Sequence, residues 1–242
     1  MAEIEPKFFR KNFRDIFAQL QPIVAKNDYT NNSIRHQPVE FFVTIVERVP
    51  SIVKNDTELL KALLDLVFKL MIDIDADIDA SWLKPKEGFR ADEEEDSVHF
   101  GKTCVDRLVS SVGEDVILPL LSQLVTNTLA NNDDWRYKNA GLMAFSQVGE
   151  YIDDIQKIAP MIPVVIQHLQ HPVPKIRYAA LHCIGQIADD MSEDFQENFH
   201  EIVLPALITM LDDSVPRVQA HACAALTNFL EGTPDNIAAQ YI

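Results

Sequence analysis

Two sets of polar side chains recur once per repeat of about 40 residues in the second half of the chain, and they could bind a basic peptide. One set holds amides and the other holds acids: Gln147, Gln186 and Asn228, then Glu150, Asp189 and Glu231. Each acid follows its amide by one helical turn, so both sets should lie on one helix face. Carboxylates spaced in this way match an extended peptide rich in lysine or arginine, because charge-assisted hydrogen bonds are the stronger ones.

The same residues also have a simpler interpretation. Polar side chains near the end of a helix can face water and bind nothing. Acids near a helix C-terminus, however, oppose the helix dipole and cost about 0.3–1 kcal/mol each at exposed positions. Because three repeats keep this unfavourable arrangement, we favour a binding role for the two sets.

A further concentration of acids interrupts the helical pattern from Asp73 to Asp96, and we call this segment the acidic insert. It contains Trp82 and the acids Asp73, Asp75, Asp77, Asp79, Glu93, Glu94, Glu95 and Asp96. One interpretation is a solvated loop that keeps the protein soluble. The other is an acidic arm that docks on a basic patch of a partner, with Trp82 as its aromatic anchor. The run DIDADID lacks the glycine and closing glutamate of an EF-hand, so calcium is rejected.

Other reactive side chains do not form a recognisable site. His168 and His171 straddle a helix end without a third ligand, which favours solvent exposure over zinc. Cys104, Cys183 and Cys223 are far apart in the sequence, so we expect buried thiols in a reducing compartment. No phosphate-binding glycine loop, nucleophile elbow or zinc-protease motif is present. We therefore expect no enzyme, no cofactor and no metal site.

The amides and acids belong to an internal repeat. Three segments align without gaps: WRYKNAGLMAFSQVGEY from Trp135, PKIRYAALHCIGQIADD from Pro174 and PRVQAHACAALTNFLEG from Pro216. Each has apolar residues at helical spacing, and proline suits the start of a helix. Each follows another apolar helix, expected over 116–129, 159–169 and 201–211. Small residues at matching positions predict close helix contacts, and we expect Arg177 to pair with an acid of a neighbouring turn, such as Asp213.

Helical hairpins at this interval are typical of HEAT repeats, and one hairpin cannot bury its own apolar face. We predict an all-α, right-handed superhelical solenoid with a concave binding surface. The expected repeats are 1–56, 57–113 with the insert at 73–96, 114–153, 154–193, 194–233 and the start of another at 234–242. In the first half we expect helices over 7–26, 38–54, 58–74 and 98–112. The incomplete last repeat predicts an internal piece of a longer chain.

Composition restricts the class of partner. A formal net charge of −16 and a sequence pI near 4.7 disfavour nucleic acids and anionic membranes and favour basic proteins. No apolar run approaches the ~20 residues of a membrane span, and the first residues lack the apolar core of a secretory signal. We expect a cytosolic or nuclear monomer that binds other proteins.

The segments NDDWRYKNAGLMAFSQVGE, PKIRYAALHCIGQIADD, NFHEIVLPAL and RVQAHACAALTNFLEGTPDN resemble consecutive HEAT repeats of the importin-beta superfamily of karyopherins, most closely the importin beta-3 branch. This resemblance implies nuclear import. It implies cargo signals rich in lysine and arginine on the concave face, pore phenylalanine-glycine repeats between outer helices, and cargo release by Ran with GTP. It also implies shuttling between cytoplasm and nucleus.

The resemblance assigns roles to residues as well. It implies that Glu150, Asp189, Asn228 and Glu231 grip the basic signal, and that the acidic insert lies where the family has a loop associated with Ran. The acidic run is interrupted by three basic residues, Lys84, Lys86 and Arg90. The insert therefore differs from a simple anionic arm. The alternative function is a HEAT scaffold subunit that organises a multiprotein complex, in which these acids are only solvated.

Overall fold

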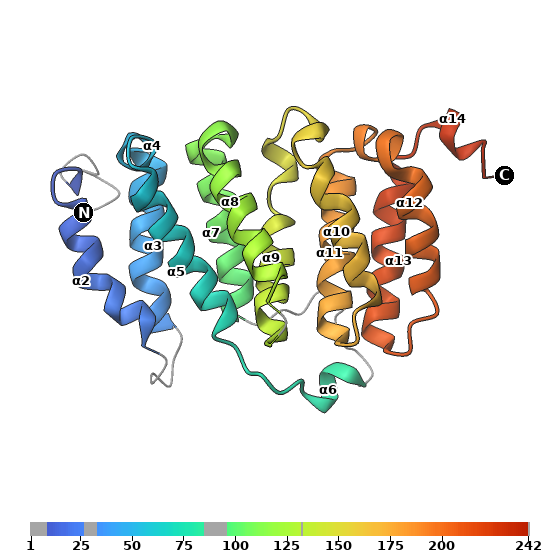
Figure 1. Ribbon diagram of the computed structural model, residues 1–242, viewed down its shortest axis with the longest axis horizontal. Coiled ribbons are helices and arrows are strands. Elements are labelled where there is room, and N and C mark those ends of the chain that lie inside the picture. The colour runs from blue at the N-terminus through green and yellow to red at the C-terminus, as the bar shows by residue number, and fades with distance from the viewer. Residues whose placement is uncertain (1–8, 27–32, 85–95, 132, 242) are drawn as a thin grey trace. The chain divides into compact units, whose positions relative to one another are not determined.

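The computed structural model describes residues 9–26, 33–84, 96–131 and 133–241 (Figure 1). Helices joined by turns make up these residues, and no strand occurs among them, which confirms the predicted all-α class. None of the described helices is both long and apolar enough to cross a membrane. The chain divides into two compact units: unit 1 holds residues 1–74 and 94–144, and unit 2 holds residues 75–93 and 145–242.

Unit 1 is built from helical hairpins whose apolar faces pack together. Its helices are α2 (Phe13–Ala25), α3 (Ser33–Arg48), α4 (Ser51–Lys54), α5 (Thr57–Ile72), α7 (Asp96–Val112), α8 (Glu114–Leu129) and α9 (Trp135–Phe145), the last residue of which falls in unit 2. Asp56 caps α5 by accepting a hydrogen bond from the Leu59 N–H at 3.2 Å. The predicted helix over 38–54 is instead two helices, because Pro50 ends α3 and opens α4.

Helix α3 also begins at Ser33, five residues earlier than predicted, with Pro38 inside it. The extra turn carries Arg35, whose side chain is only 1% exposed. Its guanidinium donates to the Val24 carbonyl at 2.9 Å and to Asp73 at 2.6 Å. These bonds join α2, α3 and the end of α5. The buried charge of Arg35 therefore holds the first turn of α3 in place, which the apolar period of the sequence does not reveal.

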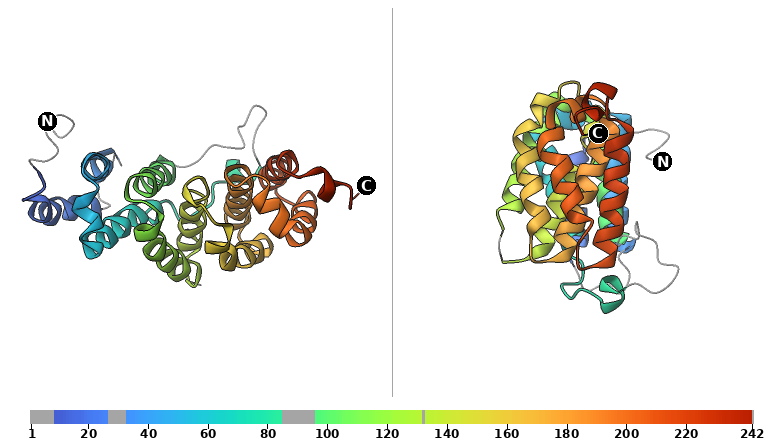
Figure 2. Two further views of the ribbon diagram at one scale, coloured as in Figure 1. Left: turned by 90° about the horizontal axis from the view of Figure 1, so that it is seen from above. Right: turned by 90° about the vertical axis from the view of Figure 1, so that its right-hand side faces the viewer.

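Unit 2 contains the repeat that the sequence shows most clearly. Its elements are α6 (Ala80–Leu83), the 3-10 helices η1 (Gly149–Tyr151), η2 (Ile155–Lys157) and η3 (Ala159–Met161), then α10 (Ile162–Gln167), η4 (His168–Gln170), α11 (Pro174–Asp190), α12 (Asp194–Met210), α13 (Pro216–Glu231) and α14 (Asp235–Ala238). Helices α11, α12 and α13 lie alongside one another (Figures 1 and 2). The prediction for α11 agrees at both ends, and α13 ends one residue early.

The first helices of these repeats differ more from expectation. The helix predicted over 159–169 is α10 between the 3-10 turns η3 and η4. Pro160 and Pro163 lack the backbone N–H that would extend the α-helix through η3. The helix predicted over 201–211 starts at Asp194, seven residues earlier. Its first turns bury Phe195 and Gln196. The prediction missed these turns because most of their residues are polar and show no apolar period.

Small residues bring α11 and α13 close together, as predicted. A Cβ atom added to Gly185 would lie 3.1 Å from the Ala225 Cα. Ala180 and Ala222 are fully buried. The two second helices therefore approach almost backbone to backbone.

The predicted link between repeats is also present. The Arg177 guanidinium binds Asp213 with two hydrogen bonds, Nε to Oδ2 at 2.6 Å and Nη2 to Oδ1 at 2.9 Å. It also donates to the His171 carbonyl at 2.9 Å. Because the side chains are only 14% and 5% exposed, this bidentate pair is well shielded from solvent.

Two of the three cysteines are buried. Burial raises the pKa of the Cys104 thiol to about 12 and also raises the pKa of Cys183. The expectation of a buried thiol is wrong for Cys223, which is exposed. It follows the buried Ala222 directly, and one residue turns the side chain by about 100° around a helix, here into solvent.

Candidate functional site at the ends of the second helices

The acids selected from the sequence lie at the C-terminal ends of the second helices in unit 2. Asp189 is in the last turn of α11 and Glu231 is the last residue of α13. Both side chains are exposed, and so is Glu150. None of the ion pairs among the described residues involves these three carboxylates. They can therefore accept cations from outside the chain.

The position of the first acid needs a correction. Helix α9 ends at Phe145, so Gln147 lies in a turn and Glu150 in η1 rather than on a second helix. Gly149 explains how the turn is accommodated, since a Cβ atom there would lie 2.8 Å from the Asp190 Cβ. The turn packs directly on the end of α11. Glu150 is thus brought to α11 by a close contact and not by helical register.

Asp190 belongs to this group, although the sequence analysis missed it. Burial raises the pKa of its carboxyl to about 6, and the neighbouring charges of Asp189 and Glu150 act in the same direction. Gln186 opposes this shift by donating Nε2–H to Oδ1 at 2.8 Å. The aligned positions in the other repeats are Tyr151 and Gly232, so comparison between repeats could not select it. Its adjacency to Asp189 was the available signal.

The amides hold positions inside the chain. Gln147 donates to the Ser146 hydroxyl at 2.8 Å, and Asn228 donates to the Gly185 carbonyl at 3.1 Å. Gln186, as described, donates to Asp190. Each amide nitrogen that was expected to hold a peptide backbone therefore has a partner within the protein. These contacts order the acidic helix ends.

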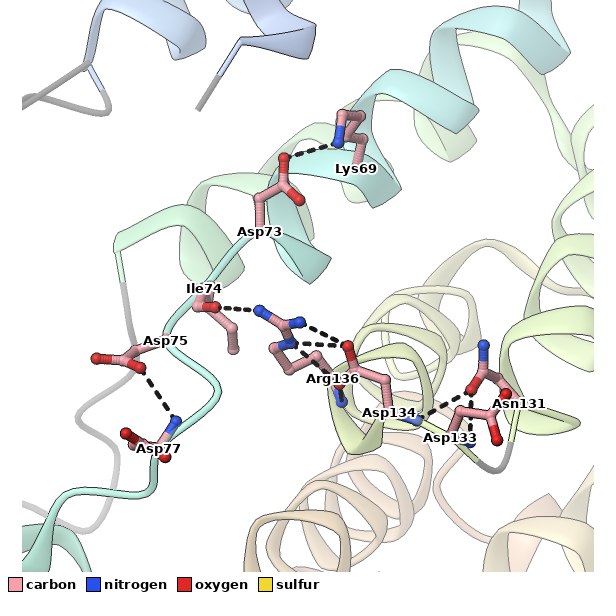
Figure 3. A network of polar contacts seen from close by, with 9 residues as sticks. All are labelled: Lys69, Asp73, Ile74, Asp75, Asp77, Asn131, Asp133, Asp134 and Arg136. Carbon is pink, nitrogen blue, oxygen red and sulfur yellow. Dashed lines mark hydrogen bonds and ion pairs between the residues drawn. The ribbon is translucent and has the colours of Figure 1, made fainter. Parts of the chain in front are cut away.

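The start of the acidic insert is more structured than predicted. Asp73 accepts from Lys69 at 2.9 Å (Figure 3) and from Arg35. Its side chain is only 17% exposed, so it belongs to the packing of unit 1 and is not an exposed acid. In the same close-up Arg136 binds Asp134 and donates to the Ile74 carbonyl at 2.8 Å. The prediction of an insert that begins at Asp73 is wrong, because these contacts hold the backbone through Ile74.

Beyond that point the acids shape local turns. Asp75 accepts from the Asp77 N–H at 3.0 Å, and Asp79 caps α6 by accepting from the Ser81 N–H at 2.5 Å. All three side chains are exposed. Glu93, Glu94 and Glu95 lie outside the described residues, as does the side chain of Asp96, whose backbone starts α7.

Trp82 of the insert packs against α11 and α13 of its own unit. Its ring packs edge-on against Tyr178 with centroids 5.7 Å apart, and it lies 5.5 Å from both Lys175 Nζ and Arg217 Cζ. Trp82 and the N-terminal turns of α11 and α13 therefore form one packed cluster, at the helix ends opposite the acids.

The histidine pair does not extend the candidate site. His168 and His171 stack with their ring centroids 6.3 Å apart, and both are half-buried. His168 Nδ1 lies 2.8 Å from the Val164 carbonyl. Among the described residues, no group of three or more potential metal ligands is found.

Comparison with known proteins agrees with this arrangement. A model described as an importin repeat matches residues 27–119, and one described as HEAT repeats of the GCN1-like stalled ribosome sensor matches residues 115–242. Importin subunit beta-3 of Saccharomyces cerevisiae is 30% identical over 251 residues, which cover 100% of this chain. The chain belongs to the importin-beta superfamily of karyopherins. Within it, the chain is most like the importin beta-3 branch.

Solved karyopherin structures support the same assignment. Kap121p bound to the extreme C-terminus of the protein phosphatase Cdc14p matches 99% of this karyopherin chain with a TM-score of 0.89 and 27% identity. Kap121p bound to RanGTP matches with a TM-score of 0.88 and 27% identity, again over 99% of the chain. The match confirms the HEAT-repeat fold. The chain spans 22% of the length of importin subunit beta-3 and 24% of each of these Kap121p chains.

Proposed function

We propose that this chain is the part of a nuclear transport receptor that binds the basic localisation signal of a cargo protein. Its contact surface would be the last turns of α11 and α13, which carry Asp189 and Glu231, together with the η1 turn, which carries Glu150. The observation that carries the proposal is that these carboxylates are exposed and available to external cations, one per repeat. Asp190 adds a fourth carboxyl beside them. The concave location of this surface is part of the proposal.

The charge balance of the chain supports a basic ligand. With a net charge of −16, the protein attracts lysine-rich segments at long range, and the local acids then hold individual ammonium groups. A relative, Kap121p, binds the extreme C-terminus of another protein. An extended segment is a suitable ligand, because its side chains can reach acids in successive repeats.

Fluorescence anisotropy with a labelled lysine-rich peptide tests this proposal. The variant Glu150→Gln/Asp189→Asn/Glu231→Gln should lose about 10- to 100-fold in affinity, as expected if each exposed charge-assisted contact contributes about 0.5–1 kcal/mol. The control Glu197→Gln/Glu201→Gln/Asp212→Asn removes the same charge from exposed positions of unit 2. If the two triple variants lost the same affinity for the peptide, the effect would come from net charge alone and the site would be refuted.

A cavity in unit 1 supports a second contact of the same transport function. It has a volume of about 320 Å³ and lies between α5 and α8, the first helices of two successive repeats. Its wall combines apolar, amide and charged side chains. The lining residues are Phe68, Ile72, Leu124, Tyr137, Asn127, Asn131, Thr128, Asp65, Lys69 and Asp73. We propose that it accepts a phenylalanine ring of a pore phenylalanine-glycine repeat, with the amides available to the peptide backbone.

NMR titration with a phenylalanine-glycine peptide tests the cavity. Leu124→Ser should abolish the shift changes of residues around it, while the exposed leucine variant Leu230→Ser should leave them unchanged. Persistence of the shifts in Leu124→Ser would exclude this cavity as the binding site.

Ran completes the proposed cycle. We propose that in the full-length receptor Ran with GTP releases the cargo, and that the receptor shuttles between cytoplasm and nucleus. Kap121p, a relative, binds RanGTP. Asp75 and Asp77 are exposed acids of the described part of the insert, and we propose them for a Ran or regulatory contact, whereas Asp79 caps α6. In a RanGTP titration, a full-length receptor carrying Asp75→Asn/Asp77→Asn should bind RanGTP more weakly than the unaltered receptor. Equal affinity of the two receptors would remove the insert from this role.

A further inference from the structure

The first turns of α11 and α13 hold the side chain of Trp82 from several sides. Lys175 and Arg217 each place their cationic group 5.5 Å from the indole centroid, within the range of cation–π attraction. Tyr178 contacts the ring at an interplanar angle of 75°, the edge-to-face geometry that aromatic pairs favour. His221 stacks on Tyr178 at 4.2 Å and supports it. These contacts come from two successive repeats.

The backbone and charge of the segment are recognised as well. Arg217 Nε donates to the Trp82 carbonyl at 3.3 Å, although this arginine is only 4% exposed. The charge of Lys175 helps to lower the pKa of Asp79, after the larger effect of the hydrogen bonds from Ser81. The Asp79 carboxylate thus lies within the electrostatic field of Lys175, whose ammonium group also faces the indole of Trp82. Recognition of an acid, an aromatic ring and a carbonyl together is typical of a peptide-binding site.

We propose that the first turns of α11 and α13 form a binding site for an acidic, tryptophan-containing segment, and that residues 79–83 occupy it in cis. A partner segment of the same chemistry binds by displacing the chain's own copy. The tethered copy competes at an effective concentration on the order of millimolar, so it screens out weak ligands. This site is independent of the basic-signal site, because it uses the opposite ends of the same helices and the opposite charge.

Tryptophan fluorescence tests the cis contact. The sequence has 2 tryptophans, so Trp135→Phe leaves Trp82 as the only tryptophan, and excitation at the red edge of the absorption band selects it over the 5 tyrosines. In that background, Lys175→Gln/Arg217→Gln should raise the acrylamide quenching constant about twofold, and Lys175→Gln alone should raise it less. Acrylamide is neutral, so the lost charges do not alter its local concentration. The control Arg48→Gln/Lys54→Gln removes two exposed cations from unit 1 and should change nothing. The contact would be overturned if the quenching constant were unchanged in Lys175→Gln and also in Lys175→Gln/Arg217→Gln, provided that circular dichroism shows the double variant to have its normal helix content.

A peptide titration tests the site itself. A labelled peptide of sequence DADIDASWLK, residues 75–84, should bind the Trp82→Ala chain at least about 10-fold more tightly than the unaltered chain, in which the site is occupied. The same peptide with alanine in place of tryptophan should not bind. Equal affinity for the two chains, or no saturable binding to Trp82→Ala below about 5 mM, overturns the proposal. The lysine-rich peptide titration is unaffected by either result, so the two sites are judged separately.

Discussion

Replacing Asp190 with asparagine should stabilise the protein near neutral pH. The folded chain raises the pKa of this carboxyl from 3.8 to about 6, mainly by burial. A raised pKa in an aspartate means that the folded state binds the proton more tightly, so the group favours folding below pH 4 and opposes it as the pH rises through 6. Asparagine keeps the shape and never ionises, and its single side-chain oxygen can accept from Gln186, while the hydrogen bond from the Glu150 backbone N–H is lost.

The size of the effect follows from the shift. Each pKa unit corresponds to 1.36 kcal/mol, so ionising Asp190 would cost about 3 kcal/mol at pH 7.5 if solvent gave no screening. The side chain keeps substantial contact with water, and we halve the value to about 1.5 kcal/mol. At pH 5 the same arithmetic gives about 0.8 kcal/mol. Asp190→Asn should therefore stabilise the chain about twice as much at pH 7.5 as at pH 5.

Urea denaturation followed by far-UV circular dichroism measures this difference. The control is Asp212→Asn, which removes the same charge from an exposed position in unit 2 and should change stability by less than about 0.5 kcal/mol at either pH. A stabilisation by Asp190→Asn that does not grow between pH 5 and pH 7.5, or that the control reproduces, would refute the assignment of a strained, half-buried carboxylate at this position.

Three further substitutions test the packing of the two units by the same denaturation measurement. Arg177→Ala should cost about 2–3 kcal/mol, because it leaves the nearly buried Asp213 without its bidentate partner; a cost below 1 kcal/mol would mean that the pair is solvated. Gly185→Val should cost about 1–3 kcal/mol, since its side chain meets the backbone of Ala225, and a neutral result would show that α11 and α13 can separate freely. Arg35→Ala should cost about 3 kcal/mol through loss of a buried charge network, whereas Arg35→Lys should recover part of it.

Much of the fold was predictable from the sequence. The apolar period and the proline starts place α11 correctly at both ends, and the alignment of small residues anticipates the contact at Gly185. Local pattern fails where a tertiary contact decides. Helix α9 ends early because its following turn packs on α11, and the extra turn of α3 exists because Arg35 is buried between neighbouring elements.

The candidate site was predictable only in part. Comparison between repeats selects side chains that occupy equivalent positions, and it places Asp189 and Glu231 at exposed helix ends. It cannot find Asp190, whose role depends on a neighbour from the preceding turn. Nor can it find the contact of Trp82, because Tyr178 and Arg217 are distant from Trp82 in the sequence. The full set of repeat boundaries stays a prediction.

The near contact of α11 and α13 has a consequence for ligand choice. Helices that meet through glycine and alanine lie at the short end of the usual 8–10 Å interaxial range, and an extended peptide advances about 3.3 Å per residue. Dividing about 8 Å by about 3.3 Å shows that the carboxylates on these helices would be matched by cationic side chains two to three residues apart. The small residues between α11 and α13 thus set the distance between neighbouring carboxylates, and this distance selects ligands by the spacing of their lysines.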